Sequence, residues 1–260
     1  MEIIGSVFDF IEKLPVPMWL WPAGLFAFLL AMLVFHLTLE VRRGSMWKRA
    51  AMTLGFEHRD EDTSLADRFK FLVSFYDVGG FDTRSFDVLT GESASAQTWL
   101  LDHGSGKPRT LRTACIMRTS ELQAPYFHLW QRPSLSLRLR RPLQPEIVFE
   151  EDADFSHIFV LSAENPEAVR NLFVPVVREH FKRIFHRCRE IEKLNNDWLT
   201  ILMLRVSNGI GRFEVEASGD TLSVHLSRII NPRGAADFLA LTAETREILQ
   251  REQNEAKVAQ

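Results

Sequence analysis

The most site-like peptide of the sequence is Asp102-His103-Gly104-Ser105-Gly106-Lys107. Its glycines could expose backbone N–H groups to an anion, and Lys107 would add a positive charge. The peptide lacks the G-x-x-x-x-G-K-[ST] spacing of a phosphate-binding loop, because a proline stands where serine or threonine should follow the lysine. We therefore favour a polar hairpin turn and keep Asp102, His103, Ser105 and Lys107 as a candidate loop site.

Two other peptides carry side chains that could do chemistry. Ser45-Met46-Trp47-Lys48 matches S-x-x-K, in which a lysine activates a serine nucleophile, but the companion motifs of that enzyme class are absent. The acidic residues Glu150, Glu151, Asp152 and Asp154 offer oxygen ligands for calcium or magnesium, yet they lack the order and the glycine of an EF-hand loop. A solvated loop is the better interpretation. The sequence thus predicts no catalytic residue, no metal site and no cofactor.

Basic side chains are concentrated in a predicted helix between residues 178 and 193. This helix could form a patch for anionic lipid headgroups, at about 1 kcal/mol for each basic residue. A solvated helix face paired with neighbouring glutamates is the simpler interpretation. Nucleic acid is not expected, since the net charge is −3 and no RNA- or DNA-reading motif is present. The candidate patch consists of Arg178, Lys182, Arg183, Arg187 and Arg189.

An uncharged segment lies between Lys13 and Glu40. Within it, residues 18–39 form an apolar run of about 22 residues, enough to cross the roughly 30 Å hydrocarbon layer as a helix. The positive start and the cleavage site of a signal peptide are missing. We predict a transmembrane helix at residues 17–40, preceded by a short extracytoplasmic N-terminus at residues 1–16.

The flanks of this segment predict its orientation. Arg42, Arg43, Lys48 and Arg49 follow it, so the positive-inside rule places residues 41–260 in the cytoplasm and makes the chain a single-pass protein of the inner membrane. Cysteine usage agrees, because Cys115 and Cys188 lack metal-like spacing and suit a reducing compartment. The expected interface anchors are Trp19 and Trp21 on the outer side and Trp47, Arg42 and Arg43 on the inner side.

Two features of the membrane segment could be functional. Ala23, Ala27 and Ala31 form a small-xxx-small ladder that lets helix backbones approach closely, although alanine is also common in any membrane helix. His36 is an ionisable group in an apolar run and is the one candidate ligand for a haem or chlorophyll. A neutral histidine one turn from the interface can instead reach headgroups at little cost.

The rest of the chain reads as an α+β domain with mainly antiparallel strands and packed helices. Helices are predicted at residues 46–54 and 64–71. A third helix is expected to begin at Asn165-Pro166 and to be divided at Pro175. A last helix is expected to run from Asn231-Pro232 to about residue 253. Residues 58–64 are expected to form a polar turn, and a subdivision is possible near 195–197. Strands are predicted at 86–89, 97–101, 110–117, 126–130, 135–139, 147–149, 157–161, 199–206, 213–217 and 222–226.

Three stretches resemble a family of uncharacterised bacterial membrane-anchored proteins. They are FDVLTG at 86–91, PYFHL at 125–129 and IVFEEDADFSHIFVLSAENPEAVRNLF at 147–173. The sequence departs from the family at Leu101-Asp102-His103, where its members often have an Asp-Tyr pair. The resemblance implies a membrane anchor before a cytosolic α+β domain, and it implies no activity.

These observations favour a membrane-anchored cytosolic interaction module, an accessory or scaffold subunit of a larger membrane assembly. Its partner would be another membrane protein, or a second copy bound through the membrane helix. One alternative is a membrane-associated hydrolase or transferase, which should gather His103 with carboxylates or Ser105 in one pocket. The other alternative is a module that binds anionic lipid surfaces.

Overall fold

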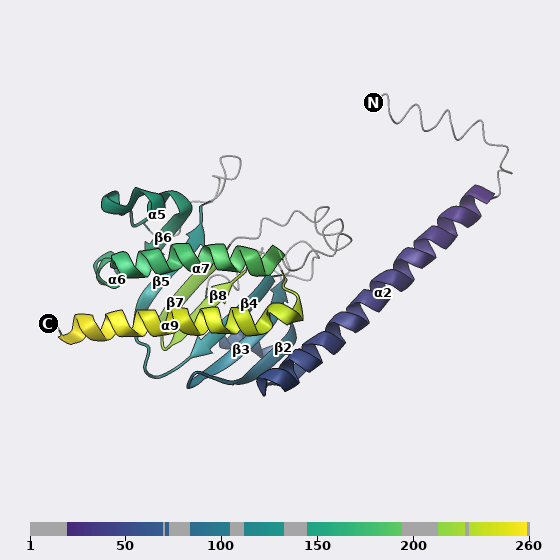
Figure 1. Cartoon of the computed structure of the whole chain (residues 1–260), viewed down its shortest axis with the longest axis horizontal. Helices are drawn as coiled ribbons and strands as arrows, with labels where there is room; N and C mark the ends of the chain where they lie inside the picture. The colour runs from purple at the N-terminus through teal and green to yellow at the C-terminus, as the bar shows by residue number, and fades with distance from the viewer. Residues whose placement is uncertain are drawn as a thin grey trace, which may run out of the picture. The chain divides into compact units, whose positions relative to one another are not determined.

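The computed structural model describes residues 20–69, 71–72, 84–104, 112–132, 145–193, 213–226 and 229–258. The chain divides into two compact units, Met1–Ser45 and Met46–Gln260. Figure 1 labels the main elements. The helical elements are α2 (Leu20–Leu54), α3 (Ser64–Arg68), η3 (Glu150–Asp152), α5 (Ala153–Ile158), α6 (Pro166–Leu172), α7 (Pro175–Lys193), η4 (Pro232–Gly234) and α9 (Ala235–Val258). The strands are β1 (Glu57–Glu61), β2 (Arg84–Ser93), β3 (Ala96–Gly104), β4 (Arg112–Arg118), β5 (Ala124–Gln131), β6 (Phe159–Ala163), β7 (Glu214–Gly219) and β8 (Thr221–His225).

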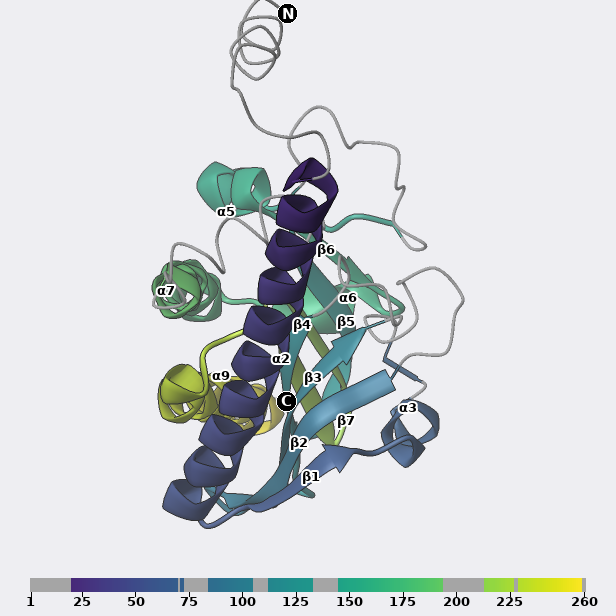
Figure 2. The same cartoon turned by 90° about the vertical axis from the view of Figure 1, so that its right-hand side faces the viewer.

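The described strands form an eight-stranded sheet in the order β1-β2-β3-β4-β8-β7-β5-β6. All neighbouring strands in this order pair antiparallel. Figure 2 shows α7 and α9 on one side of the sheet and α3 on the other. The predicted α+β class, with mainly antiparallel strands and packed helices, is confirmed.

Local signals in the sequence set several element ends. The Asn165 side chain accepts a hydrogen bond from the Ala168 amide at 3.1 Å and so caps α6. The predicted division at Pro175 is confirmed, because α6 ends at Leu172 and α7 begins at Pro175. Gly219 adopts a positive φ of 58° in the turn that joins β7 to β8, a conformation that glycine tolerates without strain.

Three expectations about the elements were wrong. Residues 57–61 form the edge strand β1 instead of a polar turn, because pairing with β2 uses backbone groups and leaves the polar side chains in solvent. Residues 153–158 form α5, so the strand expected at 157–161 begins only at Phe159. Residues 147–149 are irregular beside a single bridge between Glu146 and Ser162. The strands expected at 135–139 and 199–206 and the subdivision near 195–197 lie outside the described residues.

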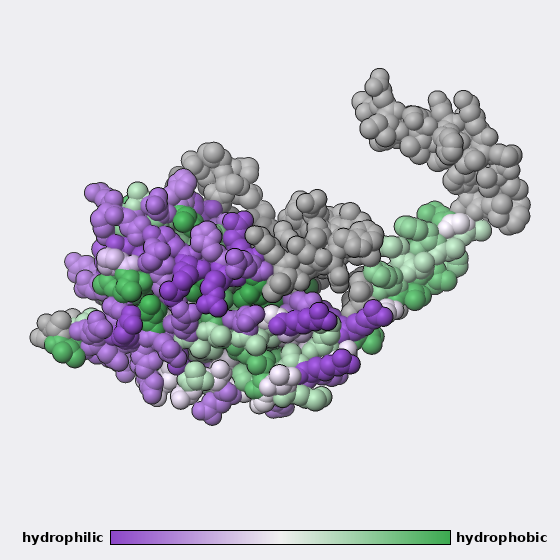
Figure 3. All heavy atoms as spheres, viewed as in Figure 1, coloured by the Kyte–Doolittle hydropathy of each residue, from purple (hydrophilic) through white to green (hydrophobic). Residues whose placement is uncertain are grey.

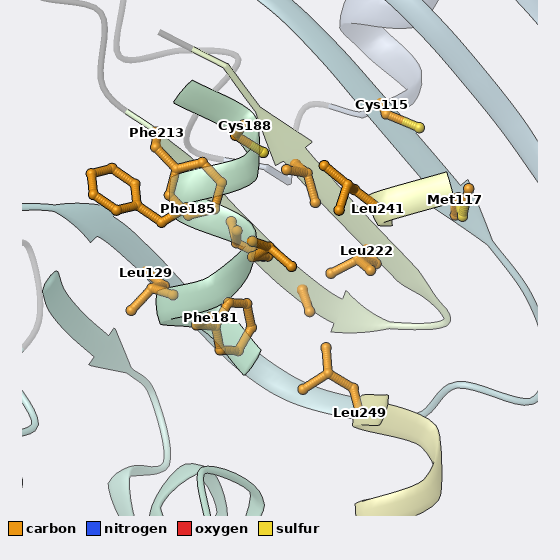
Figure 4. Packing of buried hydrophobic residues seen from close by; sticks show 14 of the residues in the cluster. Cys115, Met117, Leu129, Phe181, Phe185, Cys188, Phe213, Leu222, Leu241 and Leu249 are labelled. Carbon is orange, nitrogen blue, oxygen red and sulfur yellow. The ribbon is translucent and has the colours of Figure 1, made fainter. Parts of the chain in front are cut away.

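The larger hydrophobic core fills the space between the sheet and the helices α7 and α9. Figure 4 shows Phe181 and Phe185 of α7 and Leu249 of α9 gathered with Leu129 and Leu222 of the sheet. A smaller cluster lies on the opposite face, where Leu65 and Phe69 pack on Trp99 and Ile116. We call the face toward α7 and α9 the helix face.

Helix α2 begins in the first unit and ends in the second. Most of its described apolar side chains in the first unit are exposed. Figure 3 colours this part of the helix as hydrophobic. Among the helices of the described residues, none combines the length and hydropathy that crossing a membrane requires. Trp47 in the second unit is fully buried in the large core, together with Ala51. This corrects the expectation that Trp47 is an interface anchor, because a buried indole cannot reach lipid headgroups.

Candidate functional site

Polar side chains gather on the sheet face opposite α7 and α9. They alternate with apolar residues along β5, β7 and β8, so they share one face. Across the strands, His128 lies opposite Glu216, and Glu214 lies opposite His225. We call the set the polar face: His103, Arg112, Tyr126, His128, Trp130, Glu214, Glu216, Ser223 and His225.

Most of the polar face is buried. Glu214 is only 4% exposed, and His103, Glu216, Ser223 and His225 are fully buried. Burying charged or polar groups is costly unless they are paired or hydrogen-bonded. The ion pairs and hydrogen bonds between these groups therefore decide which of them could contact a ligand.

Arg112 and Glu214 form a buried ion pair between β4 and β7, with Nη1 and Oε1 3.0 Å apart. Burial alone would raise the pKa of the Glu214 carboxyl. The positive charge of Arg112 and the polar contact from His128 outweigh the effect of burial and hold the pKa of Glu214 well below its ordinary value. Glu214 is therefore ionised at neutral pH and acts only as a hydrogen-bond acceptor.

His103 and His225 form a second pair, from β3 and β8. Nε2 of His103 lies 3.0 Å from Nδ1 of His225, and the rings meet edge to face. Burial lowers the pKa of both imidazoles, and it brings that of His225 to about 3 against the opposing charge of Glu214. Both rings are neutral at neutral pH, so one donates the shared hydrogen bond and the other accepts it.

The half-buried part of the polar face is a strip along β5 formed by Tyr126, His128 and Trp130. The rings of His128 and Trp130 lie 4.6 Å apart, centroid to centroid. Nε2 of His128 lies 3.7 Å from Oε2 of Glu214, which is too long for a direct hydrogen bond. Burial raises the pKa of Tyr126, and the adjacent carboxylate of Glu216 raises it further, so the phenol stays protonated.

Arg112 offsets Glu214 and the two paired histidines are neutral, so the Glu216 carboxylate leaves the polar face with an excess of negative charge. In the described part of the chain, no three histidine, cysteine or acidic side chains converge as metal ligands.

The candidate loop site is divided by the structure. Asp102 and His103 lie in β3 rather than in a turn, and adjacent strand residues point to opposite faces. His103 belongs to the polar face. Asp102 lies on the other face, where its Oδ1 accepts a hydrogen bond from the Thr113 hydroxyl at 2.5 Å. Ser105 and Lys107 lie outside the described residues.

The candidate basic patch is largely engaged in ion pairs. Arg178 is buried and binds Asp152 and Glu151 at 3.1 and 3.2 Å. Lys182 pairs with Asp152 and Glu179. Arg183 and Arg187 both pair with Glu244 of α9. The remaining member, Arg189, lies 5.5 Å from the Phe185 ring. Lipid binding by this helix stays a prediction.

The acidic cluster is helical and does not form the expected loop, although Glu150, Glu151 and Asp154 are exposed to solvent as expected. Glu150–Asp152 form η3, and Asp152 caps α5 by accepting a hydrogen bond from the Phe155 amide at 3.1 Å. Burial opposes ionisation of Asp152, but this amide and the Arg178 guanidinium lower its pKa. The cluster therefore stabilises a helix start.

The roles predicted for residues of the membrane segment and its flanks are not tested by the structure and stay predictions. Ala23, Ala27 and Ala31 are exposed on α2, as is Arg42, while Arg43 is half-buried. The Ser45 hydroxyl donates to the Arg42 carbonyl at 2.8 Å, and Lys48 pairs with Asp60 at 3.4 Å. Trp19 lies outside the residues that the structure describes. The structure also does not describe the side chains of Trp21 and His36.

Sequence reasoning missed most of the polar face. Arg112, His128, Glu214 and His225 belong to no motif, and their partners lie far away along the chain. A signal was present in the alternation of Glu214 and Glu216 with Val215 and Ala217, which is typical of a strand with one polar side. That pattern predicts solvent exposure, whereas the structure buries these carboxylates.

No protein-family model and no curated protein sequence matches the chain. A solved structure with a similar fold is the crystal structure of the mycobacterial trehalose monomycolate transport factor A, TtfA. The TM-score is 0.50 at 13% sequence identity, and the match covers 80% of this chain and 94% of that chain. At this identity, the chain is similar to TtfA in fold alone.

Proposed function

We propose that this chain is a membrane-anchored accessory protein of the inner membrane. In this proposal, the N-terminal helix holds the α+β domain on the cytoplasmic side, where the domain binds a protein partner within a larger membrane assembly. Residues 1–16 would then lie outside the cytoplasm.

The observation that carries the proposal is the exposure of large apolar side chains on α2. Those between residues 25 and 34 are 49–68% exposed. Contiguous apolar surface of this kind marks contact with a membrane or another protein. The residues are Leu25, Phe26, Phe28, Leu29, Leu30, Leu33 and Val34.

Continuity of the helix adds support. The same helix α2 runs without interruption to Leu54, and its last turns contribute Trp47 and Ala51 to the core of the second unit.

The likeness to TtfA also supports an accessory role. That protein is named a transport factor. The proposal extends to this chain only the general role of assisting another component.

Membrane fractionation tests the anchor. The full-length protein should stay in the membrane pellet after an alkaline carbonate wash, and the double variant Leu29→Arg/Leu30→Arg should move to the soluble fraction. Each arginine at a helix centre costs roughly 2.5–3.5 kcal/mol of insertion free energy. The control is Met52→Arg, a change at a 77% exposed residue in the second unit, which should leave fractionation unchanged. Native protein in the soluble fraction would refute the anchor.

Two further measurements test orientation and partner. A green fluorescent protein fused after residue 260 should fluoresce, and an alkaline phosphatase fused there should be inactive. Crosslinking in native membranes followed by purification in mild detergent should then recover a defined second protein. A strictly monomeric product would argue against an accessory subunit.

A further inference from the structure

We propose that the edge strand β1 (Glu57–Glu61) is a docking site for a basic, extended segment of a protein partner, which adds to the sheet as a further strand. This partner is the protein of the proposed function, on which the inference rests. The strand supplies the surface and the binding chemistry that the proposed function leaves open.

The first observation is the place of β1 in the sheet. The strand stands last in the order, so β2 pairs with one of its sides and no described strand pairs with the other. Figure 2 shows β1 at the lower end of the sheet. Its residues are exposed, except for the half-buried His58. An open edge of this kind is a template for pairing with another chain.

The hydrogen bonds between β1 and β2 show which backbone groups of β1 point outward. The Asp62 amide donates to the Ser85 carbonyl at 3.2 Å, in the same register as the rest of the pair. In an antiparallel pair, hydrogen-bonded and non-hydrogen-bonded positions alternate. Glu57, Arg59 and Glu61 therefore occupy the positions whose N–H and C=O groups point away from β2. These groups form the row that an added strand needs for its own hydrogen bonds.

The charge of the edge selects its occupant. Residues 57–62 carry four carboxylates and one guanidinium. The guanidinium is already engaged, because Arg59 binds Glu57 at 3.1 Å and Asp62 at 3.5 Å. Glu61 is exposed and has no ion-pair partner among the residues that the structure describes. Opposite charges that face each other across strands stabilise their pairing, so this edge favours a strand that carries lysine or arginine.

The same charges disfavour a second copy of this chain. Antiparallel pairing of two β1 strands centred on Arg59 would place the two Arg59 side chains opposite each other and Glu57 opposite Glu61. Like charges in these positions destabilise strand pairing. Any other register still joins two segments that each carry four negative charges and one positive charge. The edge thus resists self-association by its charge and stays open to a basic strand.

The position of β1 in the chain fits a membrane protein as the source of that strand. Helix α2 ends at Leu54, and β1 begins three residues later, at Glu57. Cytoplasmic segments next to membrane helices carry an excess of lysine and arginine. The juxtamembrane segment of a membrane protein therefore has the charge that β1 attracts.

Peptide binding to the full-length protein in a neutral detergent tests the site. The probe is a fluorescent heptapeptide of alternating lysine and valine, and the reference is a heptapeptide of alternating lysine and proline with the same charge. Fluorescence anisotropy should show saturable binding of the probe, about tenfold tighter than that of the reference, because proline cannot donate hydrogen bonds to β1. The probe should also slow hydrogen exchange at the outward amides of Arg59 and Glu61.

Variants of β1 separate backbone pairing from charge. Arg59→Pro removes one outward amide and should weaken binding of the probe about tenfold. Its matched control, Arg59→Gln, loses the same charge but keeps the amide, and should bind at least as tightly as native protein. Glu57→Gln/Glu61→Gln should weaken binding about fivefold at low salt and less at high salt. Glu164→Gln/Glu167→Gln, at two exposed residues outside β1, should have no effect.

Equal binding of probe and reference, or native-like binding by both Arg59→Pro and Glu57→Gln/Glu61→Gln, would overturn the proposal. If Arg59→Pro lowers the melting temperature, the comparison of the two peptides on native protein still decides. Dimerisation of the native protein that the probe competes with would assign the edge to a second copy and would also overturn it.

The test separates this docking site from the proposed function. Peptide binding does not require a membrane, so a result against the anchor would leave it unchanged. Absence of probe binding, in a protein that stays anchored and is crosslinked to a partner, would refute the docking site alone.

Discussion

The helix face and the polar face bury their residues by different means. On the helix face, Cys115, Leu129 and Val224 pack against apolar side chains of α7 and α9. On the polar face, Glu214, His103 and His225 are equally buried but are paired with polar groups: Glu214 with the largely buried Arg112, and His103 with His225. Burial of apolar area is favourable for almost any shape that fills the space, whereas a buried ion pair needs its specific partner.

This difference separates stability from specificity. A buried salt bridge is weak evidence for stability, because apolar residues of similar volume often serve as well. The helix face therefore accounts for most of the stability of the second unit. On the polar face, the groups are held in fixed positions at a cost that packing does not require.

The largest effect is expected from Phe181→Ala on the helix face. Phe181 is fully buried and stacks on Phe173 with ring centroids 5.3 Å apart. The free energy of unfolding should fall by about 4 kcal/mol, from lost burial and the cavity left behind. Denaturant unfolding of the purified protein measures it. Val176→Ala, at an exposed site of the same helix, should change stability by less than about 0.5 kcal/mol.

On the polar face, Glu214→Gln should lower the free energy of unfolding by about 3 kcal/mol, because Arg112 loses its counter-charge while largely buried. The double variant Arg112→Met/Glu214→Leu should recover most of this loss. A double variant as unstable as Glu214→Gln would mean that the pair stabilises the fold by itself, and the contrast between the faces would fail.

Acid should weaken the second unit through the polar face. The pKa of His225 is about 3 in the folded protein, because burial disfavours the charged ring, against roughly 6.5 when unfolded. Between these values the unfolded state binds a proton that the folded state does not. The free energy of unfolding should thus fall as pH drops below about 6.5, by up to about 1.4 kcal/mol per pH unit from this group. The slope should be smaller in His225→Asn and unchanged in His157→Asn.

The smallest effect should come from an exposed counterpart of the buried pair. Arg118 of β4 binds Asp220, the turn residue before β8, at 2.7 Å, with both side chains well exposed. Asp220→Asn should cost at most about 1 kcal/mol, and added salt should reduce that cost further. A loss as large as that of Glu214→Gln would show that burial is not what makes the polar face sensitive.

Local chemistry explains which parts of the fold were predictable. Asn165 and Pro166 start α6, and Pro175 starts α7, because caps and prolines act within a few residues. Strand β1 was missed, since an edge strand with the sequence EHRDE has no apolar side to reveal it. Trp47 was misplaced, because a tryptophan beside an apolar segment suits a lipid interface and a protein core equally well.

By itself, the sequence determined where most helices begin, which strand residues share a side, and that an uncharged apolar segment precedes an α+β domain. Only the tertiary structure decided which polar groups meet. Arg112 and Glu214 are 102 residues apart, and His103 and His225 are 122 apart. The reason is physical: periodicity and capping act between near neighbours in the chain, whereas the pairing of buried charges depends on the strand order and register of the finished sheet.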